Sequence, residues 1–276
     1  MPPGAAVRFD NTQTCYGGLD SNGSAVVTVT EGEVVAIVNQ IGDTAPSVNL
    51  QQTYNGFAPA DSGNTLYAPI ALNEFYGFNS SFQVQNISGD TMTICATYSD
   101  GVRECVEDVE DRASATFLQG YETHEPNWTG SAIVTNTIGG AMVGIVNQQS
   151  DKSAASFNMY IGGASMWALP SLLDEYYGFT SAFQVQNISG DIVDILVTYD
   201  DGVRRRIDGI AHGGVATFVQ ADEIGHTPNQ AFSALVRSLA PGTTELGGDI
   251  VVVVNHDLIN PGAIDYQYSH NPMPLD

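Results

Sequence analysis

Basic residues are scarce in this chain of 276 residues. It carries 8 Lys plus Arg against 31 Asp plus Glu, Lys152 is the only lysine, and the formal net charge is −23. A field of that sign repels phosphate backbones, which makes nucleic acid a poor partner. The polar surface is therefore built mostly from uncharged side chains, a composition that suits an extracellular or cell-surface setting.

Long hydrophobic runs are also missing. The longest apolar runs, such as residues 250–254, are far too short to cross a bilayer, so the sequence predicts no membrane span. No basic segment followed by an apolar stretch opens the chain, so we expect no signal peptide in the residues given. Apolar residues still make up 43% of the chain, which is enough to fill a core.

The sequence motifs of common enzymes are missing as well. We find no G-x-S-x-G elbow, P-loop or dinucleotide fingerprint, and no CxxC or HExxH spacing. We therefore expect no catalytic residues, no metal site, no cofactor and no enzymatic activity. Calcium at the acidic turns stays open beside ordinary turn chemistry, although none of these turns has the spaced carboxylates of a calcium loop. The candidates are Asp100 with Gly101, Asp200 with Asp201, and Asp90 or Asp191.

Only three cysteines are present, and two of them flank a short turn. Gly101 stands at the third loop position between Cys95 and Cys105, as a three-residue hairpin with a bulge requires. That hairpin places the two thiols opposite each other, which predicts a disulfide and an oxidising compartment. Cys15 is left over, and it is free, buried or paired with another chain.

One stretch of the chain occurs twice. Residues 76–90 read YGFNSSFQVQNISGD and residues 177–191 read YGFTSAFQVQNISGD, so 13 of 15 positions are identical at an interval of 101 residues (177 − 76). Repetition at such an interval indicates tandem structural units. His124 and His226 recur in a second repeated motif, H-x-P-N, where repetition favours a loop-shaping role.

Short runs with alternating polarity, separated by Gly, Asp and Ser turns, indicate an all-β protein with almost no helix. A helical turn or two over residues 72–76 is the one exception we consider. Seven short strands per repeat favour a two-sheet immunoglobulin-like sandwich of about 100 residues. We expect strands over residues 6–10, 24–30, 34–40, 48–54, 82–87, 92–98, 102–109, 113–119, 131–137, 142–148, 155–161, 183–188, 193–199, 203–210, 215–220, 234–239, 250–255 and 264–268.

The first repeat in the sequence is incomplete. The motif VNQ or VNH ends a strand at residues 38–40, 146–148 and 254–256, with both intervals equal to 108 residues (146 − 38 and 254 − 146). Aligned in this way, residues 1–64 hold only the last four strands of a repeat, and residues 65–164 and 165–276 form two complete sandwiches. A partial sandwich exposes an edge that the neighbouring domain, residues 66–78 or another subunit must cover.

Two further groups of residues are candidates for contact with sugars. The N-x-Ser/Thr pattern predicts glycosylation, although a turn-capping role is an alternative for the two asparagines that follow the repeated strand. Recurring aromatic residues are expected at the junction between repeats, with a sugar-binding platform as the alternative. The sequons are Asn22, Asn79, Asn86, Asn127 and Asn187, and the aromatic residues are Tyr76, Phe78, Tyr177, Phe179 and Trp167.

The YGFxSxFQVQNISGD run, the T-Y-x-D-G-V hairpin and the G-x-IVNQ-type strand resemble the tandem immunoglobulin-like modules of secreted bacterial cell-surface proteins. The resemblance spans nearly the whole chain and implies β-sandwiches, an extracellular structural or adhesive role and no catalytic residues. We expect a subunit of an extracellular filament or surface layer that joins copies of itself head to tail through the incomplete module. A monomeric adhesin or carbohydrate-binding module is the alternative, and a virion or phage-tail protein is a third.

Overall fold

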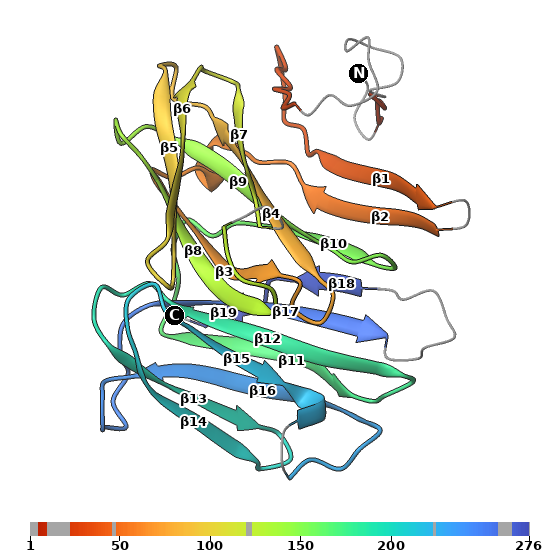
Figure 1. Ribbon diagram of the computed structural model, residues 1–276, viewed down its shortest axis with the longest axis vertical. Coiled ribbons are helices and arrows are strands. Elements are labelled where there is room, and N and C mark those ends of the chain that lie inside the picture. The colour runs from red at the N-terminus through yellow and green to blue at the C-terminus, as the bar shows by residue number, and fades with distance from the viewer. Residues whose placement is uncertain are drawn as a thin grey trace.

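The computed structural model describes residues 5–9, 23–45, 48–119, 123–222, 225–258 and 267–275 (Figure 1). In these ranges the only helical elements are two single 3-10 turns, η1 (Pro59–Asp61) and η2 (Gln220–Asp222). No helix in the described ranges is long and apolar enough to cross a membrane. The all-β class expected from the sequence is therefore confirmed.

The chain folds into a hairpin followed by two β-sandwiches. In the first sandwich, β3 to β10, the sheets have the strand orders β3-β8-β5-β6 and β10-β9-β4-β7. In the second sandwich, β11 to β19, the orders are β14-β13-β16-β11-β19 and β15-β12-β17-β18. The strands are β1 (Ile37–Ala45), β2 (Val48–Asn55), β3 (Thr65–Asn73), β4 (Asn79–Asn86), β5 (Met92–Tyr98), β6 (Arg103–Val109), β7 (Ser114–Leu118), β8 (Trp128–Asn136), β9 (Met142–Gln149), β10 (Ala154–Asn158), β11 (Met166–Asp174), β12 (Phe179–Asn187), β13 (Val193–Tyr199), β14 (Arg204–Ile210), β15 (Val215–Val219), β16 (Gln230–Leu239), β17 (Ile250–Leu258), β18 (Gln267–His270) and β19 (Met273–Pro274).

Alternating polarity sets the orientation of the repeated strand. Phe82 and Val84 of β4 are buried, whereas Gln83 between them is partly exposed, so one face of the strand points into the sandwich. Phe183 and Val185 of β12 are buried in the same way. The buried residues of both sandwiches form one continuous apolar cluster.

Two long strands, and the short strand β19 (Met273–Pro274), were missed by the sequence analysis. Residues 65–73 and 166–174 form β3 and β11, and the helical turn considered over residues 72–76 is absent. Both strands contain a proline, Pro69 or Pro170, within a shift of register against the partner strand. Because proline cannot donate to a ladder, it is tolerated in a strand at such an irregularity. The proline and the neighbouring apolar residues interrupt the alternation of apolar and polar side chains by which a strand is predicted.

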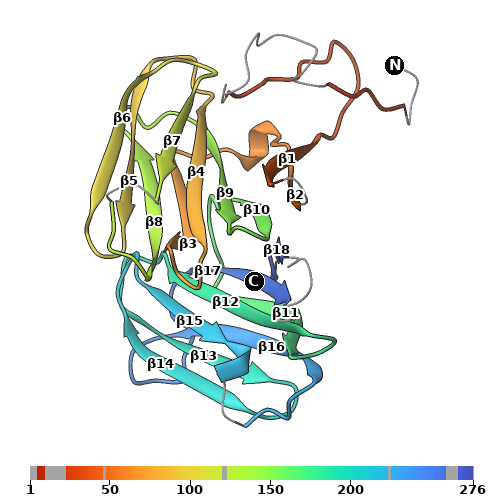
Figure 2. The ribbon, with the colours of Figure 1, turned by 45° about the vertical axis from the view of Figure 1, so that its right-hand side comes forward.

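The N-terminal part departs most from the expected strands. Residues 5–9 and 23–36 belong to no strand, so the strands expected over residues 6–10 and 24–30 are wrong within the described ranges. Figures 1 and 2 show residues 23–36 passing beside the sheets without joining one. The sequence has the alternation of strands, but a strand needs a partner, and no described strand pairs with these residues.

The predicted disulfide is present. Cys95 and Cys105 lie directly opposite each other in the β5–β6 ladder and are bonded. Gly101 adopts the left-handed conformation that the hairpin turn requires, with φ +90°. Cys15 lies outside the described residues.

Candidate interaction surface

The N-terminal hairpin β1–β2 has the register of a hairpin found in each sandwich. In every case an asparagine in the first strand faces a hydroxyl residue in the second, and the hydroxyl donates to asparagine Oδ1 at 2.6–2.8 Å. The hairpins β1–β2, β9–β10 and β17–β18 are therefore the same local unit. The paired residues are Asn39 and Thr53, Asn147 and Ser156, and Asn255 and Ser269.

These three hairpins contact one another in succession. Ser156 Oγ of β10 also lies 2.6 Å from Gln52 Oε1 of β2, so its single hydroxyl proton is shared between Gln52 and Asn147. Gln148 of β9 and Asn255 of β17 exchange two amide hydrogen bonds, at 3.2 and 3.0 Å. Figure 1 shows β2, β10 and β18 following one another along one side of the molecule. Each hairpin thus packs on the next through its uncharged polar side chains.

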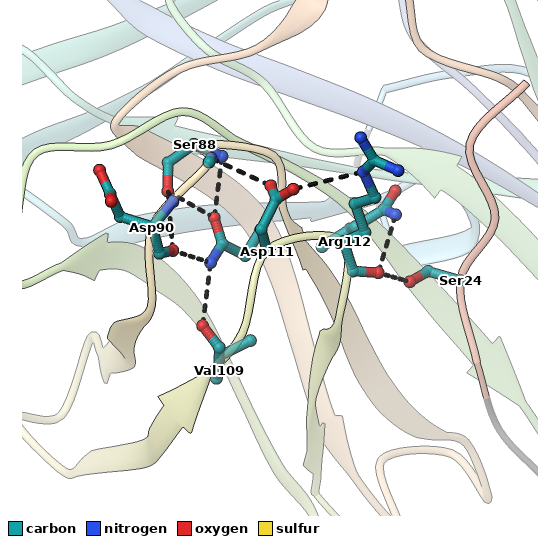
Figure 3. Close-up of polar contacts among 9 residues, drawn as sticks. Ser24, Ser88, Asp90, Val109, Asp111 and Arg112 are labelled. Carbon is teal, nitrogen blue, oxygen red and sulfur yellow. Dashed lines mark hydrogen bonds and ion pairs between the residues drawn. The ribbon is translucent and has the colours of Figure 1, made fainter. Parts of the chain in front are cut away.

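A second contact between consecutive units is also repeated, and Figure 3 shows one of its two copies, Ser24 against Arg112. Ser131 of the first sandwich donates to the carbonyl of Gly213 in the second at 2.6 Å. Ser24 of the N-terminal segment donates to the carbonyl of Arg112 in the first sandwich, also at 2.6 Å. Ser24 begins the sequence SAVVTVT and Ser131 begins SAIVTNT, and Arg112 and Gly213 occupy the same left-handed turn position. Residue 24 therefore lies against the first sandwich as residue 131 lies against the second.

The backbone links between units are repeated too. Gly63 and Met142 exchange two backbone hydrogen bonds, at 3.0 and 2.8 Å, where the N-terminal part enters the first sandwich. Ala164 and Ile250 do so at 3.1 and 3.0 Å where the chain enters the second. Paired backbone hydrogen bonds fix the direction of the chain. At both connections the chain therefore enters the next sandwich in the same direction relative to the strand it pairs with.

Apolar residues that are buried in both sandwiches are exposed in the N-terminal unit. Val35 and Ile37 are 101% and 65% exposed. Their counterparts at the interval of 108 residues, Val143 and Ile145, are 5% and 4% exposed, and the next pair at the same interval is fully buried in β17. Exposed apolar side chains in a strand sequence mark a surface that binds another strand or sheet. We refer to residues 34–40, which include the start of β1 and whose backbone edge away from β2 pairs with no described strand, as the open edge of β1.

The backbone geometry shows which side of β1 is open. The carbonyl of Ala36 accepts from Gly56 on the β2 side at 2.9 Å, so the peptide groups of Val35 and Ile37 face the opposite side. The corresponding side of β9 pairs with β4, and that of β17 pairs with β12. Within the described ranges, β1 pairs with β2 alone.

Two of the five sequons are closed by turn contacts. The Asn86 amide donates to the carbonyls of Asp90 at 2.7 Å and Val109 at 2.9 Å, and Ser88 donates to its oxygen. Asn187 makes the equivalent contacts, and both side chains are fully buried. A glycan has no access to these amides in the folded chain, because they cap the turn as the alternative reading proposed.

The other sequons differ from one another. Asn127 is exposed in a left-handed turn conformation, so its amide is accessible. Asn79 is half-buried and accepts a hydrogen bond from the backbone of Glu74. Asn22 lies outside the described residues. Glycosylation of Asn127 and Asn79 stays a prediction.

The recurring aromatic residues lie in different environments. Tyr76 and Tyr177 project into solvent from left-handed turn positions and are 73% and 84% exposed. Phe78 and Phe179, two residues later, are half-buried. Trp167 is buried and donates from its indole to the carbonyl of Ile250 at 2.9 Å. Trp167 and, in part, Phe78 therefore pack against the core, whereas the two tyrosines do not, and a role of these residues at the repeat junction stays a prediction.

The repeated H-x-P-N histidines close one end of each sandwich. The His124 ring stacks on Trp128 at 3.6 Å, and the His226 ring stacks on Phe232 at 4.4 Å. Each imidazole also contacts a turn aspartate, with Nε2 of His124 3.3 Å from Asp100 and Nδ1 of His226 2.6 Å from its partner, Asp201. Burial lowers the pKa of His124, and the Asp100 carboxylate opposes that shift.

A cavity of about 470 Å³ lies beside His124 in the first sandwich. Asp100, Glu125 and Trp128 line it together with Val102 and Thr123. In the described residues no group of three or more His, Cys, Asp or Glu side chains could hold a metal ion. The cavity combines an indole with two carboxylates, which is the chemistry of a contact with a hydroxyl-rich or cationic ligand.

A serine and a histidine are hydrogen-bonded in the second sandwich, but the serine is enclosed. Leu173 N–H donates to Ser181 Oγ at 2.8 Å, and the Ser181 hydroxyl shares a hydrogen bond with His256 Nδ1 at 2.8 Å. Burial, and to a smaller extent His270, lowers the pKa of His256 to about 4. Ser181 is fully buried, so no substrate reaches its hydroxyl, and the pair serves the packing of β12 against β17.

No protein-family model matches the chain, and no curated protein matches its sequence. One similar solved structure is CfaE, the adhesive subunit of the CFA/I fimbria of enterotoxigenic Escherichia coli, which is 8% identical with a TM-score of 0.17 over 80% of this chain and 95% of that chain. A mutant of the same adhesin is 7% identical with a TM-score of 0.15, over 76% of this chain and 94% of that chain. Likenesses at this level support no inference about the present chain.

Proposed function

We propose that this protein is a non-enzymatic structural component of an extracellular or cell-surface assembly, which joins copies of itself head to tail through the N-terminal unit. The observation that carries the proposal is the repeated contact of Ser24 with Arg112 and of Ser131 with Gly213. An interface that recurs along one chain is heterologous, because it joins two different surfaces. Heterologous interfaces extend into open arrays when the rotation between units does not close a ring.

The open edge of β1 supplies the joint in this proposal. Val35 and Ile37 are exposed there, although their counterparts in both sandwiches are buried. Burying an apolar side chain of this size stabilises by about 1.5–3 kcal/mol, so covering the edge is strongly favoured. The scarcity of charged side chains along residues 34–40 removes a common device that keeps edge strands apart.

The proposal is tested by light scattering and negative-stain imaging of the intact chain. We expect particles larger than one chain, in strings or layers. Val35→Asp combined with Ile37→Asp changes two exposed residues, so the sandwiches should stay folded while assembly is lost. A matched control is the exposed pair Ile138→Asp and Ile192→Asp, which lies in loops of the two sandwiches and outside the N-terminal unit. A monodisperse monomer at all concentrations would overturn the proposal.

A second candidate function is adhesion to a carbohydrate by a monomer. The observation that favours it is the exposure of Tyr76 and Tyr177 at left-handed positions, where non-glycine backbone is costly and often functional. Binding of the intact chain to a glycan array, lost in the Tyr76→Ala and Tyr177→Ala variant, would support it. Unchanged binding in that variant would exclude the two tyrosines as the glycan site and make the cavity beside His124 the next candidate.

A further inference from the structure

We propose that β6 of one copy of this chain pairs antiparallel with β14 of a second copy. This contact lies away from the N-terminal unit, so the inference goes beyond the proposed function. In the strand orders β3-β8-β5-β6 and β14-β13-β16-β11-β19, each of the two strands ends a sheet. Figure 2 shows both at the outer margin of the molecule. Within the described ranges β6 pairs with β5 alone and β14 with β13 alone, so each copy offers both edges to a neighbour.

The two edges carry opposite charge. β6 reads RECVEDV and has a net charge of −2 (1 − 3), whereas β14 reads RRRIDGI and has a net charge of +2 (3 − 1). Three of the 8 basic residues of the chain thus stand together in β14. Charged side chains keep an edge strand apart from an edge of the same sign. Pairing of β6 with β6, or of β14 with β14, is therefore disfavoured, and pairing of β6 with β14 is favoured.

The backbones of the two strands present their hydrogen-bonding groups in the same phase. Tyr98 N–H donates to the carbonyl of Val102 at 2.8 Å, and Tyr199 N–H donates to that of Val203 at 2.9 Å. The peptide groups of residues 102 and 203 therefore face the inner partner strand, and the direction alternates along each strand. Residues 103, 105 and 107 then face the free edge of β6, and residues 204, 206 and 208 face the free edge of β14.

The charges select one register for this pairing. When Arg103 lies opposite Asp208, the same register places Glu107 opposite Arg204. These four side chains are exposed, and directly opposite residues of an antiparallel pair lie on the same face. A shift by two residues either places Arg103 opposite Arg206 or leaves one pair of opposite charges in place of two. Both ion pairs of the favoured register therefore form together or not at all.

The side chains on both edges have capacity left for a second copy. Arg206 Nε donates to Asp208 Oδ1 at 2.6 Å, and the Asp208 side chain is still 71% exposed. Asp108 and Gly209 take left-handed conformations just beyond the paired residues, with φ 55° and φ 75°, so the ladder ends after residues 107 and 208. A ladder of this length with exposed ion pairs is a weak contact, which suits neighbouring copies held close together in an array.

Charge reversal tests the pairing by sedimentation equilibrium. Every chain carries Val35→Asp with Ile37→Asp, so that association through the N-terminal unit does not contribute, and concentrations reach about 1 mM. We expect association at low salt that weakens at about 0.5 M salt, because salt screens exposed charges. Glu107→Arg and Arg204→Glu should each weaken association by about fivefold or more, because each variant sets like charges opposite each other.

A double variant tests the register. Glu107→Arg with Arg204→Glu exchanges the two charges and should recover the association of the parent chain. The matched control, Glu110→Arg with Arg204→Glu, has the same net charge and should stay weakened, because Glu110 is exposed but lies beyond the end of β6. A parent chain that stays monomeric up to the highest concentration, or a double variant that associates no better than the control, would overturn the proposal.

Hydrogen exchange tests whether the edges themselves meet. As the concentration of the parent chain rises, the amides of residues 103, 105, 204 and 206 should gain protection, whereas those of residues 104 and 106, which face β5, should not change. Unchanged exchange at the four edge amides would refute strand pairing. These outcomes are distinct from those of the assembly test, because copies joined through the N-terminal unit can form strings without this contact.

Discussion

The hydroxyl of Ser131 donates to the carbonyl of Gly213 at 2.6 Å, and this buried bond joins the two sandwiches. Removing it in Ser131→Ala leaves a buried carbonyl without its partner, so we expect a loss of about 1–2 kcal/mol in the free energy of unfolding. Ser24→Ala removes the equivalent bond at an exposed site, so its cost should stay below about 0.5 kcal/mol. Urea denaturation measures both variants. Equal losses would contradict the assignment of these bonds to a buried and an open interface.

In each sandwich an aromatic ring covers the histidine of the H-x-P-N loop, but the ring comes from a different position along the strand. Trp128 lies opposite Asn73 and Gly130 opposite Ala71 in the β3–β8 ladder. In the second sandwich the equivalent positions hold Gln230 and Phe232, and the phenylalanine ring takes the place of the indole. A Cβ on Gly130 would approach the Trp128 ring to 2.4 Å, so the glycine is required by the tryptophan.

We predict that Gly130→Ala lowers the free energy of unfolding by about 1–3 kcal/mol, because the added carbon overpacks the site. The double variant Trp128→Gln with Gly130→Phe copies the second sandwich and should recover most of that loss. Thermal unfolding of the wild-type chain and the two variants provides the measurement. A double variant less stable than Gly130→Ala would show that the two arrangements are not interchangeable.

Most of the fold could be predicted, because turn residues and the alternation of apolar and polar side chains can be recognised from short stretches of sequence. The hairpin of Cys95 and Cys105 follows from one glycine at the correct loop position, and the β4 pattern fixes which side chains point inward. Strands β3 and β11 were missed because a proline stands in each, where the register shifts, and the burial of their residues does not alternate along the strand. A bulge is recognised only from the pairing of a strand with its partner, and the sequence of one strand does not contain that pairing.

The interaction surface could be predicted only in part. The interval between VNQ motifs indicated an incomplete first repeat, which stays a prediction, and the register of β1–β2 resembles that of β9–β10 and β17–β18. The contact of Ser24 with Arg112 could not be predicted, because a serine that begins a strand-like run has no distinguishing sequence signal. The burial of Asn86 was indicated only by its place at the end of a strand, where an amide can cap the turn.

Reduction of the disulfide should weaken the first sandwich selectively. In the chain-entropy model a bridge that closes a loop of this length contributes about 2.5–3 kcal/mol. We expect Cys95→Ala with Cys105→Ala to lower the free energy of unfolding of the first sandwich by about this amount. The second sandwich has Leu196 and Arg206 at these positions and is the internal control. Urea denaturation followed by hydrogen exchange separates the two, and an equal loss in both sandwiches would contradict the prediction.

The stability of the second sandwich should depend on pH through His256. Burial holds the pKa of this imidazole at about 4 in the folded chain, against an ordinary value of 6.5 in the unfolded chain. Between these values the unfolded chain binds a proton that the folded chain does not. The free energy of unfolding therefore falls as the pH is lowered from about 7 to about 4, by roughly 2–3 kcal/mol, and this contribution is constant outside that window.

The chain itself offers the control for this prediction. Gln148 occupies the position of His256 in the first sandwich, and Phe157 occupies that of His270, whose pKa burial also lowers. His256→Gln with His270→Phe should therefore preserve the packing and remove the pH dependence of this site. Subtracting the two unfolding curves cancels the carboxylates that titrate near pH 4 in both proteins. If the difference does not change between pH 7 and pH 4, the buried histidines are not the groups that couple folding to protons.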